Sequence, residues 1–148
     1  MALFQTATTS FKVELLQAVH NFGPTGADTF KIALYTGNAS LGPNTTQYTT
    51  DNEVTGTGYS AGGIVLTISQ TPTSGINSQQ VPTAYISFSP AVWAGATFIA
   101  RGALIYNQTQ ANKSVAVLNF GSDKVVNNQT FTITFPADTA NDAIVRIS

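Results

Sequence analysis

The one histidine and the seven acidic residues are the first candidates for acid–base chemistry, and the sequence has no cysteine for thiol chemistry. The acidic residues are Glu14, Asp28, Asp51, Glu53, Asp123, Asp138 and Asp142. A catalytic His20 would need an oriented carboxylate and a nucleophile beside it. The residues three or four positions away in the helix predicted below are not acidic: they are Leu16, Gln17, Gly23 and Pro24. We therefore expect His20 to be a helix-surface or sheet-packing residue.

Metal and cofactor sites have equally little support. With one histidine and no cysteine, mainly oxygen ligands remain, which disfavours zinc. The acidic pairs at 51/53 and 138/142 lack the Asp-x-Asp-x-Asp-Gly pattern of a calcium loop. A cation shared between subunits stays open as an alternative, as does a hydrolase that uses a carboxylate such as Glu53. The sequence predicts no catalytic residue, no cofactor-binding residue, no metal ligand and no cofactor.

The glycine-rich stretch at 56–63 contains a Gly-x-Gly pattern. A dinucleotide-binding loop would need a strand before it and a helix after it, but here the β-branched run at 64–68 follows. We therefore expect these glycines to serve backbone geometry, through positive φ angles and close backbone approach. Tyr59 would then cover the bare backbone.

Two single residues stand out in the second half of the chain. Trp93, the only tryptophan, follows Pro90, and we expect it to fill the core at one end of a sandwich. The alternative is an anchor for a sugar or a neighbouring subunit. Arg101 lies among apolar residues, so it should be paired with Asp123 or Glu53.

One amphipathic helix is predicted near the N-terminus. Its apolar stripe consists of Phe11, Leu15, Val19 and Phe22, at spacings of four, four and three. Ser10 is the expected N-cap, and Gly23-Pro24 is expected to end the helix. Such a helix should lie on a sheet.

After Pro24 the hydrophobic period changes to two, which indicates strands. The expected strands are 30–35, 64–69, 84–89, 97–107, 114–120, 130–135 and 143–147, with turn signals such as 71–75 and 127–128 between them. We expect Phe131 and Phe135 to point into the core. The chain should form a mainly β, single-domain antiparallel β-sandwich or jelly-roll-like barrel over 1–148, with one short N-terminal helix and with 1–10 as an extended N-terminal arm.

Charged residues make up only 9% of the chain, and the net charge is −1, against about 25% charged residues in an average protein. The six basic residues are scattered, which argues against direct nucleic-acid binding: Lys12, Lys31, Arg101, Lys113, Lys124 and Arg146. No segment approaches the roughly 18 apolar residues of a membrane span, so we expect no membrane contact. A neutral polar surface suits a protein that is packed in an assembly.

Several segments, taken in order, resemble a known group of proteins. They are NEVTGTGYSAGG at 52–63, Trp93 with ATFIARGALIYN at 96–107, FGSDK at 120–124 and FTITFP at 131–136. Over roughly residues 29–147 the chain is similar to small tailed-bacteriophage virion structural proteins of the capsid decoration (cement) kind. The resemblance implies a virion component, assembled in the bacterial host cytoplasm, and it brings no catalytic residues with it.

The resulting hypothesis is a non-enzymatic capsid decoration protein. Its partners would be the major capsid protein or other virion subunits, with self-association between copies. The expected contact elements are the segment 1–10, which would add a strand to a neighbour's sheet, and the polar loop 37–52.

Two alternatives remain open at this stage. One is a structural component of the tail, collar or baseplate. The other is a carbohydrate-binding β-sandwich for host attachment, with stacking faces from Trp93, Tyr48, Tyr59 and Tyr106.

Overall fold

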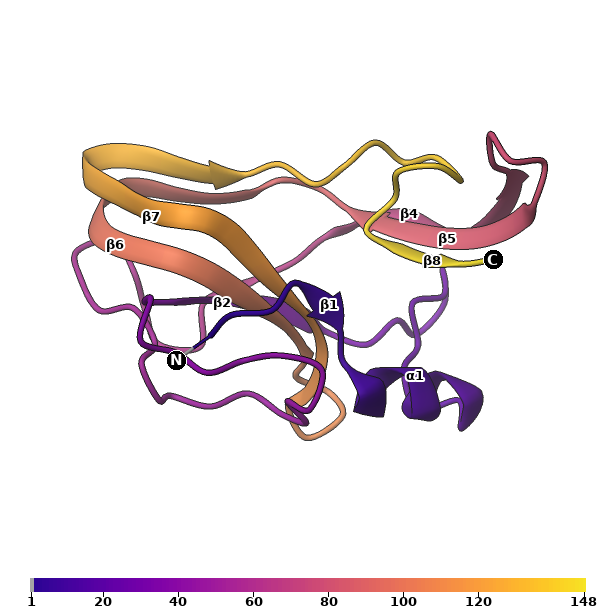
Figure 1. The fold of residues 1–148 in the computed structure, drawn as a ribbon, viewed down its shortest axis with the longest axis horizontal. Helices are drawn as coiled ribbons and strands as arrows, with labels where there is room; N and C mark the ends of the chain where they lie inside the picture. The colour runs from indigo at the N-terminus through magenta and orange to yellow at the C-terminus, as the bar shows by residue number, and fades with distance from the viewer. Residues whose placement is uncertain (1) are drawn as a thin grey trace.

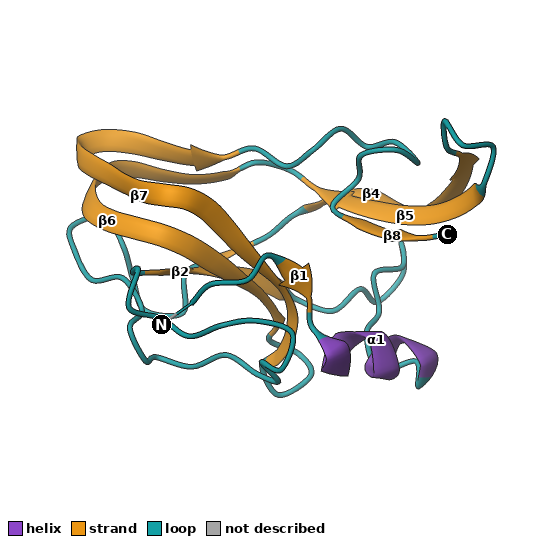
Figure 2. Ribbon diagram, in the orientation of Figure 1, coloured by secondary structure: helices purple, strands orange, loops and turns teal. Residues whose placement is uncertain are grey.

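The computed structural model describes residues 2–148 as a β-sandwich of two antiparallel sheets with one short helix (Figures 1 and 2), which confirms the expected fold class. The five-stranded sheet has the order β1-β7-β6-β2-β3, and the three-stranded sheet has the order β4-β5-β8. The first sheet contains β1 (Thr6–Ala7), β2 (Phe30–Tyr35), β3 (Ile64–Val65), β6 (Ala91–Asn107) and β7 (Lys113–Ile133). The second contains β4 (Ile68–Ile76), β5 (Pro82–Phe88) and β8 (Val145–Ile147).

The long β6–β7 hairpin belongs to both layers. Figure 1 shows it leaving the layer of β5, bending around one end of the molecule and returning in the layer of β2. Its pairing register shifts between Trp93 and Ala96 and between Ala100 and Gly102, and such bulges bend a strand. Beyond the short stretch held by β1, the half of β7 from 120 to 133 pairs with β6 alone. We call β6 residues 91–100 and β7 residues 120–133 the distal ribbon.

Two expected turns are wrong. The segment 127–128 lies inside β7, so the strands expected at 114–120 and 130–135 are one continuous strand. Asn128 absorbs the local irregularity with a positive φ of 49°. The segment 71–75 lies inside β4, where Pro72 is tolerated because β4 is an edge strand with a register shift between Gln70 and Thr73.

The helix is shorter than the apolar stripe predicts. α1 spans Thr9–Leu16, and its N-cap is Thr8, whose hydroxyl accepts a hydrogen bond from the Phe11 amide. The chain leaves the helix at Ala18, which has a positive φ of 58°. The expected N-cap at Ser10 and the expected end at Gly23 are therefore wrong. Phe22 is nevertheless buried, and its ring stacks on Phe30 at 4.3 Å.

The main core lies between the two sheets and is rich in aromatic side chains. A second, smaller core lies on the other face of the five-stranded sheet and contains Leu3, Ala33, Tyr35, Ala39, Leu41, Leu104, Tyr106 and Val117. The N-terminal segment covers part of this second core, because Leu3 pairs with Leu41 and β1 pairs with β7. In this structure the segment 2–8 is thus bound to its own domain rather than a free arm, through β1 in the sheet and Leu3 on the loop at Leu41, and removing it would uncover the second core.

Candidate functional site

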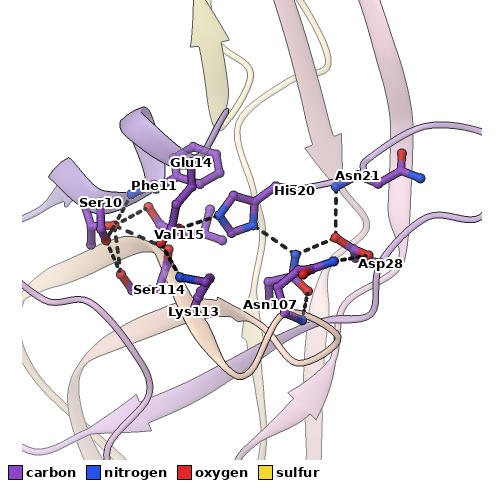
Figure 3. Close-up of polar contacts among 12 residues, drawn as sticks. Ser10, Phe11, Glu14, His20, Asn21, Asp28, Asn107, Lys113, Ser114 and Val115 are labelled. Carbon is purple, nitrogen blue, oxygen red and sulfur yellow. Dashed lines mark hydrogen bonds and ion pairs between the residues drawn. The ribbon is translucent and has the colours of Figure 1, made fainter. Parts of the chain in front are cut away.

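The most connected group of charged side chains lies where α1, the loop after it and the β6–β7 turn meet (Figure 3). Glu14 from α1 contacts His20 Nε2 through Oε2 at 2.8 Å and Lys113 Nζ through Oε1 at 2.8 Å. On the other side of the ring, Asn107 Nδ2 lies 2.9 Å from His20 Nδ1 and 2.7 Å from an Asp28 carboxylate oxygen. We call these five residues the Glu14–His20 network.

The hydrogen bonds of the network define its charges. The Asn107 amide group donates to Nδ1 of His20, so the ring proton sits on Nε2 and is donated to Glu14. Burial alone would raise the pKa of Glu14, but hydrogen bonds from Lys113 and His20, together with the charge of Lys113, outweigh burial and hold the pKa below its usual value. Burial likewise opposes ionisation of Asp28, but hydrogen bonds from Asn107, the Asn21 amide and Gln110 lower its pKa. Both carboxylates are therefore ionised at neutral pH.

A carboxylate beside a histidine is the arrangement of many acid–base sites, but this one has no free reactive atom. Both ring nitrogens of His20 are engaged, and its side chain is 0% exposed. The hydroxyls of Ser10 and Ser114, which lie in the same region (Figure 3), form no hydrogen bond with His20; the Ser114 hydroxyl donates to the Thr45 carbonyl and lies 2.9 Å from the Thr8 hydroxyl. The geometry is that of a polar joint which fixes α1 to the β6–β7 turn.

The position of His20 corrects the sequence-based expectation. His20 is not on a helix, because α1 ends at Leu16. Its carboxylate partner is Glu14, six residues earlier, a spacing that helical periodicity does not reveal. The expectation of a packing role agrees with the structure, since the His20 ring lies 4.9 Å from the Phe11 ring.

The substitution Glu14→Gln is expected to lower the free energy of unfolding by about 1–3 kcal/mol at neutral pH, the range for a hydrogen-bonded charge. A carboxylate whose pKa is lower in the folded state stabilises the protein above its unfolded pKa, and that stability is lost as the pH falls through the folded value. The ordinary value for Glu14 is 4.5. The variant should therefore lose less stability than the parent chain between about pH 6 and about pH 3.

Urea unfolding at several pH values measures this difference. The matched control is Asp123→Asn, which removes a carboxylate that is 55% exposed and should change stability by less than about 1 kcal/mol. Equal effects of the two substitutions would contradict a stabilising role for the network.

A second carboxylate, Glu53, is held by tyrosines. It accepts hydrogen bonds from the Tyr48 and Tyr59 hydroxyls at 2.6 Å each and from the Gly62 amide at 2.7 Å. The Tyr59 hydroxyl also accepts from the Leu34 amide of β2 at 2.9 Å. Burial and then the charge of Glu53 raise the pKa of Tyr106 to about 12. Both carboxylate oxygens of Glu53 therefore accept hydrogen bonds from within the chain, and these bonds fix the glycine-rich loop to the sheet.

Arg101 pairs with Asp123, one of its two expected partners, at 3.4 Å. The pair is partly exposed, with side-chain exposures of 39% and 55%, so it contributes at most about 1 kcal/mol. Glu53, the other expected partner, is engaged by the tyrosines.

Trp93 is 3% exposed and packs against Tyr59 and Phe131, so its expected role as a core residue is confirmed. Tyr106 is also buried, and the Tyr48 ring stacks on it at 4.8 Å. The proposed sugar-stacking residues thus form no shared open face. Asp138 accepts a hydrogen bond from Ser69, and Asp142 accepts one from Thr139. Within residues 2–148, no group of three or more His, Cys, Asp or Glu side chains is placed to hold a metal ion.

Two partly apolar surfaces remain open beside these clusters. The N-terminal segment and the loop 37–52, expected as separate contact elements, lie side by side and line one open groove of about 680 Å³ that includes Phe4 and Leu41. On the distal ribbon, Ile99 and Val125 are direct cross-strand partners and are 51% and 71% exposed. The sequence did not predict this pair, because Val125 lies between the expected strands 114–120 and 130–135, which are one strand in the structure.

Comparisons with known proteins give no relative. No family model matches the chain, and neither a curated protein nor a solved structure matches it. Among the described residues, no helix combines the length and the apolar character needed to cross a membrane.

Proposed function

We propose that this protein is a non-enzymatic structural component of a tailed-bacteriophage virion, and that it acts as a capsid decoration protein which binds coat subunits. The observation that carries the proposal is the distal ribbon. It combines an exposed apolar pair, Ile99 and Val125, with a long edge of β7 that has no partner strand from 120 to 133. An exposed strand edge offers a row of backbone donors and acceptors to another chain.

The chemistry of the charged groups supports the same proposal. The polar atoms of the Glu14–His20 network and of the cluster around Glu53 form hydrogen bonds within the chain. Their arrangement stiffens the joints between loops and sheets, as a subunit under mechanical load requires. The scarcity of surface charge, at 9% of residues, favours burial against a neighbour, because interface centres are depleted of charged side chains.

Cryo-EM of purified phage particles that carry this chain tests the location. We expect density for the protein on the outer shell, between capsomers, with β7 residues 120–133 against a coat subunit. Density confined to the tail, collar or baseplate would replace the decoration role by the other virion role. Absence from the particle would overturn the proposal.

The substitution Val125→Asp tests the surface. It places a charge in the centre of the ribbon's apolar pair, so the number of copies per purified particle should fall about fivefold or more, as expected when the centre of an interface is disrupted. Quantitative mass spectrometry of particles assembled with each variant gives this number.

The matched control is Val65→Asp, because Val65 on β3 is exposed to a similar extent, 59%, but lies outside the ribbon. Circular dichroism should show both variants folded. Equal incorporation of the two variants would contradict the ribbon as the shell-binding surface.

A further inference from the structure

The side of the sandwich between α1 and β8 contains a crevice. Two adjoining hollows of about 300 and 280 Å³ share the lining residues Leu15, Val145 and Ile147. One extends beneath β5 to Phe22 and Ile86, and the other extends to β1 and β7. We call the two hollows together the α1–β8 crevice.

Strand edges border this crevice. β8 pairs with β5 on one side only, and β1 pairs with β7 on one side only, so each is the last strand of its sheet. Residues of both strands line the same hollow. A strand laid along β8 would find unpaired backbone groups beside it and apolar side chains beneath it, which are the two requirements of strand addition.

The lining is mostly apolar, and it includes two basic residues. Lys12 and Arg146 line the hollow nearer β1, and no acidic residue lines either hollow. Within residues 2–148, neither Lys12 nor Arg146 lies within ion-pair distance of a carboxylate. They are two of only six basic residues in the chain, and in the crevice they lie beside an apolar floor.

We propose that the α1–β8 crevice binds an extended, acidic segment of another protein. The segment adds to the free edge of β8, places alternate apolar side chains over Val145 and Ile147, and pairs its carboxylates with Lys12 and Arg146. This inference extends the proposed function. It rests on that function in one respect: the bound segment would belong to a neighbouring virion subunit.

Fluorescence anisotropy with labelled synthetic peptides tests the inference on the isolated protein. The probe is Asp-Val-Thr-Val-Thr-Val-Asp, and the comparison peptide carries Lys in place of both Asp residues. We expect the acidic peptide to bind about five- to tenfold more tightly at low salt, from two partly exposed ion pairs, and the difference to shrink as salt screens them. A peptide with proline at the central valine should bind more weakly than either, because proline cannot complete a strand ladder.

Charge reversal locates the site. Lys12→Glu and Arg146→Glu, both at exposed positions, should each weaken binding of the acidic peptide, and the double variant should prefer the lysine peptide. Lys124→Glu is the matched control, since Lys124 is exposed on β7 and lines neither hollow; it should leave binding unchanged.

Four results would overturn the inference: no binding of either peptide, equal binding of both, an equal loss with Lys124→Glu, or self-association that Arg146→Glu abolishes. The last would assign the crevice to a second copy of this chain. Because the assay needs no particle, a negative result leaves the virion location untouched. Conversely, absence of the protein from the particle would leave a positive peptide result standing.

Discussion

The substitution Gly63→Ala is expected to prevent the chain from folding. Gly63 has a positive φ of 68°, and a Cβ atom there would lie 1.8 Å from the carbonyl oxygen of Ile32 and 2.8 Å from Cα of Ala33. Both contacts are backbone atoms of β2, which is buried and paired on both sides, between β6 and β3. Relief of the clash would require β2 to move and separate from β3 or β6, at an expected cost above about 4 kcal/mol. The yield of soluble protein and its circular dichroism measure the effect.

Gly95→Ala is the matched control for this prediction. Gly95 also has a positive φ, 56°, but a Cβ atom there would meet nothing within 4 Å. The same chemical change should therefore lower the free energy of unfolding by only about 1–2 kcal/mol, because alanine is less stable than glycine in a left-handed conformation. If the two variants unfold at the same urea concentration, the close approach of Gly63 to β2 is not what requires glycine.

The sequence predicts the character of this loop but not the critical position within it. A run of glycines followed by a β-branched segment indicates positive φ angles and close backbone approach. Gly63 approaches β2 because residues 64–65 pair with that strand, some thirty residues earlier in the chain. That contact is long-range, and no local pattern encodes it.

The strand pattern was predictable where tertiary structure agrees with local preference. The period-two pattern at 30–35 identifies β2, and the strand expected at 114–120 lies within β7. Pro72 and the Asn127-Asn128 pair were misinterpreted because edge position and a bend in the hairpin allow residues that normally end strands. Because residues 127–128 lie inside β7, the distal ribbon is one hairpin, and Ile99 and Val125 are partners within it. The strands expected from the sequence did not include Val125.

The charged network illustrates the same limit. The apolar stripe predicted that Phe11 and Phe22 face the core, and both are buried. It also extended the helix through His20, although the chain departs at Ala18 with a left-handed residue. Alanine does not signal a helix end as glycine does. The contacts of His20 with Glu14 and Asn107 depend on that departure, so the sequence suggested a packing residue and missed its polar partners.

The substitution Phe135→Ala is expected to lower the free energy of unfolding by about 3–5 kcal/mol, the range for a buried phenylalanine. Phe135 is 8% exposed, and its ring lies 5.7 Å from that of Phe88 in the main core. Phe131, two positions earlier, is only half-buried beside Phe98 and Phe120, so Phe131→Ala should cost less. Urea unfolding of both variants measures the order of the two losses.

The intervening threonine provides the control, because the alternation of this segment places Thr134 on the exposed side. Thr134→Ala should change stability by less than about 0.5 kcal/mol. A loss below about 1 kcal/mol for Phe135→Ala would mean that residues 131–135 face the other way. If Phe135→Ala costs the most stability, Phe131→Ala less and Thr134→Ala least, the period-two pattern continues past Ile133, where the ladder with β6 ends. Burial of the alternate side chains would then hold this part of the chain extended.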